Sequence, residues 1–209
     1  MEDVLSLYNL PYDEKRPVIC LDELPFQLLG EKVEPLLMKA GAVKKFDYEY
    51  VRHGTAAVFV AFEPLTGKRI VRVYPRRTKA DYCRFQQEVA LTWATGDLII
   101  EVQDNLNTHN ASSFYENLPP AEAYALMKRF EMHYTPKKGS WLNMAELELS
   151  AISRQCLARR IPDIETLGSE LNELVKERNK LEIKAKWQFT VEIAREKLNR
   201  HYEKVRSND

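Results

Sequence analysis

The stretch Val18-Ile-Cys-Leu-Asp-Glu23 decides the fold, because a short apolar run ends there in two acids. Such a run is typical of a strand that is buried in a sheet. Residues 98–104, Leu-Ile-Ile-Glu-Val-Gln-Asp, repeat the pattern and also end in an acid. If the two strands are parallel neighbours, their carboxyl ends meet at the edge where open α/β sheets bind ligands. The sequence therefore predicts that Asp22 and Asp104 lie close together.

The segments between and after these strands predict helices that cover a mixed sheet. Thr78 and Asp81 resemble a capping box at the start of a helix that Gly96 ends. Residues 24–54 give no clear pattern. The other expected elements are a hairpin over 56–62 and 68–74, helical sequence over about 110–128 and a strand over 130–134. This order indicates an α/β domain in which helices flank a mixed sheet.

A third acid follows on the next predicted helix. Asn143 is suited to cap that helix, which places Glu146 at its third position. Glu146 falls between Leu142 and Leu149 at spacings of four and three, so it lies at or beside the apolar stripe. Glu148 lies about 200° further round the helix. We therefore expect Glu146, and not Glu148, to face the other two acids.

Three carboxylates at one crevice predict a site for a hard divalent cation. An inward-facing carboxylate needs a partner, and no basic residue lies near these acids in the sequence. Ligation by oxygen alone suits Mg²⁺ or Mn²⁺. Two such ions roughly 4 Å apart activate an attacking hydroxyl and stabilise the departing oxygen of a phosphodiester. The pattern thus favours nuclease or strand-transfer chemistry.

The composition is that of a globular protein without a membrane segment or a signal peptide. The chain of 209 residues is 44% hydrophobic, and its 31 basic residues balance 31 acidic ones. We therefore expect a cytoplasmic protein. Three widely spaced cysteines predict neither a disulfide framework nor a zinc site. Local basic groups are candidates for contact with a DNA backbone, namely Arg76, Arg77 and Lys79, Lys137 and Lys138, Lys44 and Lys45, and Arg159 and Arg160.

The chain is expected to have three parts. Residues 1–15 are polar and rich in turn formers, which predicts a linker from an upstream DNA-binding region. Residues 16–162 form the predicted core. Residues 163–209 form a predicted helical extension packed on it, with one helix carrying Ile164, Leu167, Leu171 and Leu174 and another carrying Trp187, Val191, Ala194, Leu198 and Tyr202.

Three blocks of the sequence resemble the signatures of DDE transposases, specifically the bacterial insertion-sequence branch of the Tc/mariner superfamily. These blocks are residues 18–23, 101–109 and 134–146, and the likeness continues through residues 52–55, 149–156 and 187–190. The resemblance implies a ribonuclease-H-like core that depends on Mg²⁺, with Mn²⁺ as a substitute. It assigns the catalytic and metal-binding triad to Asp22, Asp104 and Glu146. It also implies that Asn105 and His109 flank the second acid, with His109 as a further DNA contact, and that Trp141 and Asn143 position the third.

The resemblance implies an enzyme that cleaves DNA and transfers strands of an insertion sequence. Its expected partners are the element ends, the target DNA and a second subunit, either an identical chain, a full-length transposase or a separate DNA-binding chain. Relatives carry helix-turn-helix modules ahead of the catalytic domain, and no such module is evident in this sequence. Two alternatives remain open: a nuclease of the same fold without strand transfer, and a catalytically silent remnant or regulator that acts by subunit pairing.

Overall fold

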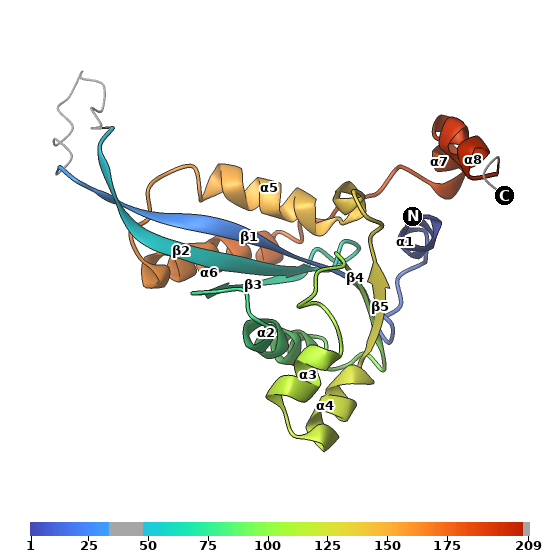
Figure 1. The fold of residues 1–209 in the computed structure, drawn as a ribbon, viewed down its shortest axis with the longest axis horizontal. Helices are drawn as coiled ribbons and strands as arrows, with labels where there is room; N and C mark the ends of the chain where they lie inside the picture. Colours follow the sequence, from blue (N-terminus) through green and yellow to red (C-terminus); the bar gives the residue numbers. More distant parts are fainter. Residues whose placement is uncertain (34–47, 207–209) are drawn as a thin grey trace.

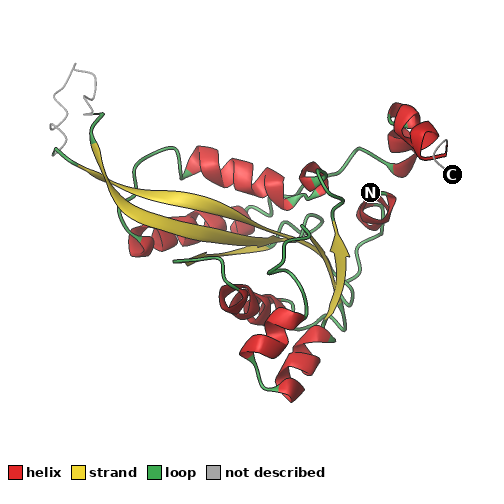
Figure 2. Ribbon diagram, in the orientation of Figure 1, coloured by secondary structure: helices red, strands yellow, loops and turns green. Residues whose placement is uncertain are grey.

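The computed structural model describes residues 1–33 and 48–206 of the chain. Lys44 and Lys45, predicted as a basic patch, lie outside the described residues. The centre of the fold is a five-stranded sheet with the strand order β3-β2-β1-β4-β5 (Figure 2). The strands are β1 (Val18–Glu31), β2 (Tyr50–Phe62), β3 (Arg69–Tyr74), β4 (Ile99–Gln103) and β5 (Phe130–Tyr134).

The pairing of the strands makes the sheet mixed. β1, β2 and β3 are antiparallel neighbours, whereas β1, β4 and β5 run parallel. Cys20 lies opposite Val102 in the parallel pair, so Asp22 and Asp104 follow at the same end of the sheet. The condition on which the expected meeting of Asp22 and Asp104 depended, parallel pairing of these two strands, is therefore met. β1 and β2 also extend far beyond the parallel pairing, over residues 24–31 and 50–54 of the segment that had no clear pattern; residues 34–47 of that segment lie outside the described residues.

Helices cover both faces of the sheet (Figure 1). One face is covered by α2 (Lys79–Thr92), α3 (Ser112–Asn117) and α4 (Pro120–Met127), and the other by α5 (Ala145–Gln155) and α6 (Ile164–Lys180). The sheet separates two apolar cores, one on each face, and alternate residues of β2 point into them. Phe59 packs in the core on the α2 side, whereas Val58 and Val60 pack in the core on the side of α5 and α6. This alternation is the period of a strand that is buried on both faces.

Residues 1–15 were predicted to be a polar linker, but part of this segment packs in a third apolar cluster. They contain α1 (Glu2–Tyr8), whose Val4 and Leu5 are fully buried against the parallel end of the sheet. Their apolar side chains fall at neighbouring positions of a single short helix, which is too little sequence to reveal a periodic pattern. The structured part of the chain therefore begins before Arg16.

The C-terminal segment also differs in part from the prediction. α6 has the predicted apolar stripe, but the second predicted helix does not begin near Trp187. That residue lies in an extended segment, where its ring packs 5.5 Å from the ring of Tyr8. Thr190 caps the helix that follows, and that helix ends at Leu198. The final elements are α7 (Val191–Lys197) and α8 (Asn199–Arg206).

Two predictions from composition can be compared with the structure. The three cysteines are free and buried. Within the described residues, none of the helices has the length and apolar character needed to span a bilayer.

Candidate active site

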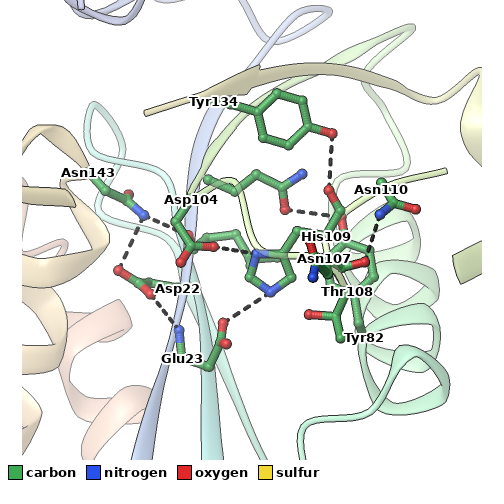
Figure 3. Close-up of polar contacts among 12 residues, drawn as sticks. Asp22, Glu23, Tyr82, Asp104, Asn107, Thr108, His109, Asn110, Tyr134 and Asn143 are labelled. Atoms are coloured by element: carbon green, nitrogen blue, oxygen red, sulfur yellow. Dashed lines mark hydrogen bonds and ion pairs between the residues drawn. The ribbon is translucent and has the colours of Figure 1, made fainter. Parts of the chain in front are cut away.

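Asp22 lies on β1, where it is held by the backbone and by the loop that precedes α5. Its Oδ1 accepts a hydrogen bond of 2.8 Å from the backbone N–H of Glu23. Nδ2 of Asn143 donates to the carbonyl of Leu21 at 2.7 Å and lies 3.4 Å from Oδ2 of Asp22 (Figure 3). Asn143 thus ties the segment before α5 directly to the strand that carries the first acid.

The pKa of Asp22 reflects the negative charges around it. Burial raises this pKa to about 7, and the hydrogen bond from the Glu23 amide only partly opposes the rise. The charges of Glu146, Glu23 and Asp104 raise the pKa further. Asp22 therefore lies near enough to Glu146 and to Asp104 for both charges to act on it.

Asp104 follows β4 and contacts a buried histidine. Its Oδ1 lies 2.6 Å from Nδ1 of His109, and Nε2 of the same ring lies 3.1 Å from Oε2 of Glu23 (Figure 3). Burial opposes ionisation of His109, but its contacts with Asp104 and Glu23 prevail and raise the pKa to about 10. The ring is consequently an imidazolium at neutral pH that donates to a carboxylate on each side.

A network of buried, hydrogen-bonded side chains packs against the ring of His109. The ring of Tyr82 stacks on that of His109 with centroids 4.8 Å apart. The Tyr82 hydroxyl donates to Gln103 at 3.0 Å and accepts from Gln86 at 2.9 Å. Gln86 also donates to the buried carboxylate of Glu101 at 2.6 Å. These contacts between α2 and β4 fix the imidazolium against the sheet.

His109 is the first of two corrections to the predicted site. Its side chain is 1% exposed, which contradicts the predicted direct contact with DNA. The sequence could not reveal this position, because Glu23 and Tyr82 come from distant parts of the chain. Glu23 itself was missed, although it directly follows Asp22.

The second correction concerns α5. Glu146 is exposed at its second position, whereas Glu148 is buried. Met144 is the N-cap, one residue later than predicted, and Asn143 instead accepts from the backbone N–H of Ala145 at 3.1 Å. The two glutamates do point to different sides of the helix. The buried side, however, is the one that carries Glu148.

The donor atoms at this edge fit a hard divalent cation. Asp22, Asp104 and Glu146 offer only carboxylate oxygens, and their mutual repulsion is relieved by a cation. Among the described residues, the group whose ligand atoms lie within 4.8 Å of one another is Glu23, Asp104 and His109, and not the predicted triad.

Four of the predicted DNA-binding cations, Arg76, Arg77, Lys137 and Lys138, lie in two exposed loops. Arg77 Nη1 is 3.6 Å from Oε1 of Glu23, so the loop before α2 borders the acidic site. Lys79, the first residue of α2, is already bound to Glu116 and Ser112. Lys137 and Lys138 are exposed in the loop after β5.

Comparison with known proteins gives one family and one set of structures. The model of a family described as DDE superfamily endonuclease matches residues 17–168. The structure of the Mos1 transposase paired-end complex with left transposon end has a TM-score of 0.56 at 16% identity, and the Mos1 strand transfer complex has 0.56 at 15%. Each match covers 87% of this chain and 55% of the other. A mariner Mos1 paired-end complex with Mg matches at a TM-score of 0.54 and 15% identity, covering 90% and 58%.

These likenesses identify the fold as ribonuclease-H-like, with a mixed five-stranded sheet between helices. Identities this low carry the fold alone. The chain spans little more than half the length of the Mos1 chains that it matches. No curated protein matches its sequence.

Proposed function

This chain belongs to the DDE superfamily of endonucleases, and from that premise we propose that it catalyses metal-dependent cleavage and strand transfer of DNA as part of a transposase. We assign it to the bacterial insertion-sequence branch of the Tc/mariner superfamily. The observation that carries the proposal is the charge repulsion that Asp22 experiences from Asp104 and Glu146 at one edge of the sheet. Within the described part of the chain, neither Asp22 nor Glu146 has an ion-pair partner, and carboxylates in this state are suited to a divalent cation.

In this proposal Asp22, Asp104 and Glu146 are the metal ligands. Mg²⁺, or Mn²⁺ in its place, supplies the positive charge that activates the attacking water or 3′-hydroxyl and stabilises the departing oxygen. Asn143 keeps Asp22 in place, since it bonds to the carbonyl beside that residue. His109 occupies one oxygen of Asp104 and leaves the other for the cation.

The surrounding residues have roles in holding DNA. Arg76 and Arg77 are exposed beside Glu23 and are suited to contact phosphates without reading bases. We propose residues 16–162 as the catalytic core and residues 163–209 as an extension, with α6 packed on the core through Leu167 and Leu171. The proposed partners are element ends, target DNA and a second subunit, either identical or a separate DNA-binding chain, in the cytoplasm.

The proposal is tested by nicking of a supercoiled plasmid and joining of pre-cut element ends with Mn²⁺ at low salt. Asp22→Asn, Asp104→Asn and Glu146→Gln are expected to abolish both reactions. Asp97→Asn is the matched control, because this exposed aspartate precedes β4 whereas Asp104 follows it. Activity that survives in the three variants contradicts the proposal. An inactive wild type, even when fused to a DNA-binding module of a relative, favours a silent remnant that acts by subunit pairing.

A further inference from the structure

The loop between β5 and α5 borders a groove that the acidic site does not use. This groove encloses about 580 Å³. Residues of the loop form one side of it and residues of α8 and its approach form the other; they include Pro136, Lys137, Lys138, Trp141, Leu198 and Tyr202. Figure 1 shows α7 and α8 beside α1 at this end of the molecule.

Trp141 presents a fixed aromatic surface in this groove. Its side chain is 49% exposed although indole is largely apolar. The ring is held by Trp187, which stacks on it at a centroid distance of 6.5 Å and 20°, and by the edge of Phe189 at 5.6 Å. The next residue, Leu142, is fully buried. Trp141 is therefore anchored from the protein side and open on the other, which suits it to bind a planar group.

The charge of the groove is positive. Lys137 and Lys138 are exposed and have no ion-pair partner among the described residues. The turn that presents them is closed by a hydrogen bond of 2.7 Å from the Gly139 N–H to the Pro136 carbonyl. Outside the lining of the groove, Lys197 lies 6.0 Å from the ring centroid of Phe189.

The acid in the groove is already neutralised. Glu2 accepts two hydrogen bonds from Arg195, at 2.9 and 2.6 Å, and one from Tyr202 at 2.7 Å. The uncompensated charges are therefore those of the lysines. An aromatic surface beside cations is suited to a ligand that is planar and anionic.

The groove is coupled to the acidic site through a short segment. Trp141 lies in the 3₁₀ turn η1 (Ser140–Leu142), two residues before Asn143. Consecutive Cα atoms are 3.8 Å apart, so the Cα atoms of Trp141 and Asn143 are separated by at most about 7.6 Å. Asn143 in turn contacts Asp22. A DNA strand at the acids would thus pass next to the groove.

We propose that this groove binds an unpaired nucleotide of a DNA strand, with its base stacked on Trp141 and the adjacent phosphates held by Lys137 and Lys138. The inference rests on the proposed function for the identity of the polymer. Every base has a face that stacks on an aromatic ring, so this binding is tolerant of sequence. A base within a duplex is stacked on its neighbours and is not available. The groove should therefore favour DNA with a single-stranded overhang over a blunt duplex.

The test measures the Kd of the full chain for two labelled DNAs, by fluorescence anisotropy in EDTA so that no cleavage occurs. One DNA is a blunt duplex, and the other is the same duplex with a single-stranded 3′ overhang. Stacking is worth about 1–3 kcal/mol per base, so Trp141→Ala should weaken overhang binding by about five- to 150-fold. Blunt-duplex binding should change little, and Trp141→Phe should retain most of the overhang preference.

Tyr124 supplies the matched control. It is another exposed aromatic residue with a lysine beside it, Lys128, on α4. Tyr124→Ala should leave both Kd values unchanged. Lys137→Ala and Lys138→Ala are surface substitutions that do not threaten the fold, and each should lower the slope of log K against log salt by roughly one.

The outcomes are distinct from those of the nicking assay. An unchanged overhang preference in Trp141→Ala and in the lysine variants overturns the groove proposal, and so does an equal loss on both DNAs. A wild type that nicks plasmid but shows no overhang preference rejects the groove and keeps the proposed function. A wild type that prefers overhangs but never nicks rejects the catalytic proposal and keeps the groove.

Discussion

Two glutamates of α5, only two residues apart, lie in opposite surroundings. Glu148 is 2% exposed and binds Arg178 through both oxygens, at 2.8 and 2.9 Å, while Arg69 lies 3.4 Å away. Glu146 is exposed, has no ion-pair partner among the described residues and shares its region with Asp22. The arginines around Glu148 neutralise the charge of that carboxylate. Among the described residues, no cation does the same for Glu146.

The difference separates a carboxylate that holds the fold from one that is available for chemistry. A buried carboxylate without cations would cost several kcal/mol, so Glu148 requires its arginines. Carboxylates left to repel one another reduce stability, and such violations are expected where a ligand completes the site. His109 is the intermediate case, because it neutralises part of the acidic edge from a buried position.

The sharpest test of this comparison substitutes each glutamate by its neutral isostere. Glu146→Gln should lower the nicking rate on the order of a thousandfold, because a group that stabilises transition-state charge is lost. Its melting temperature should hardly change. Glu148→Gln should lower the melting temperature but leave Mn²⁺ affinity, measured by calorimetric titration on the folded protein, as in the wild type. Equal losses of metal binding in the two variants would show that the helix has no such division.

The arginine cluster gives the next largest effect. Arg178→Met leaves Glu148 with a single buried partner, and breaking a buried pair costs about 3–5 kcal/mol in free energy of unfolding. Urea denaturation measures this loss. The control is Arg16→Met, whose pair with Glu131 is 51% and 39% exposed and should contribute less than about 1 kcal/mol. A loss for Arg178→Met no greater than that of the control would mean that the cluster contributes little.

The sequence could predict the edge of the sheet where the acids lie, because each of the two strands that end there has a recognisable pattern within its own residues. Apolar runs that end in Asp22 and Asp104 indicate buried strands by themselves, and their parallel pairing follows from the order of elements. The apolar stripe of α6 was likewise visible as leucines at helical spacing. The two strands that carry these acids and the stripe of α6 were therefore predicted correctly, whereas the short helix α1 and the start of the last predicted helix were not.

The partners of buried charges could not be predicted in this way. Arg69 and Arg178 reach Glu148 from β3 and α6, and nothing in the sequence of α5 distinguishes a glutamate that meets arginines from one that meets water. The helical stripe even suggested that Glu146 was the inward residue. His109 posed the same difficulty, since its position depends on Glu23 of another strand.

A buried carboxylate without a cation should make stability depend on pH. Burial outweighs the hydrogen bond from Gln86 and raises the pKa of Glu101 from 4.5 to about 7. The folded state therefore binds this proton more tightly, so its contribution to stability falls as pH rises from about 4.5 to about 7 and is level above that. The shift corresponds to about 3 kcal/mol.

Glu101→Gln removes this titration. Its stability should approach that of the wild type near pH 4.5 and exceed it by about 3 kcal/mol above pH 7. Urea denaturation at a series of pH values measures both curves. Parallel curves across the whole window would mean that Glu101 titrates normally in the folded protein.

The smallest effect is expected where a cation is already paired within the chain. Lys79 belongs to the predicted DNA-binding group, but its ammonium is bound to Glu116 and lies 3.3 Å from the Ser112 hydroxyl. Arg76, in the loop before Lys79, is exposed and has no ion-pair partner among the described residues.

Each phosphate neutralised by the protein changes the slope of log K against log salt by about 0.9. Arg76→Ala should reduce the slope by about that amount, and Lys79→Ala by much less, because Glu116 already offsets its charge. Anisotropy titrations of a blunt duplex over a range of salt concentrations measure both slopes. An equal reduction in the two variants would mean that Lys79 leaves Glu116 to bind DNA, and pairing within the chain would then not decide which cations contact phosphate.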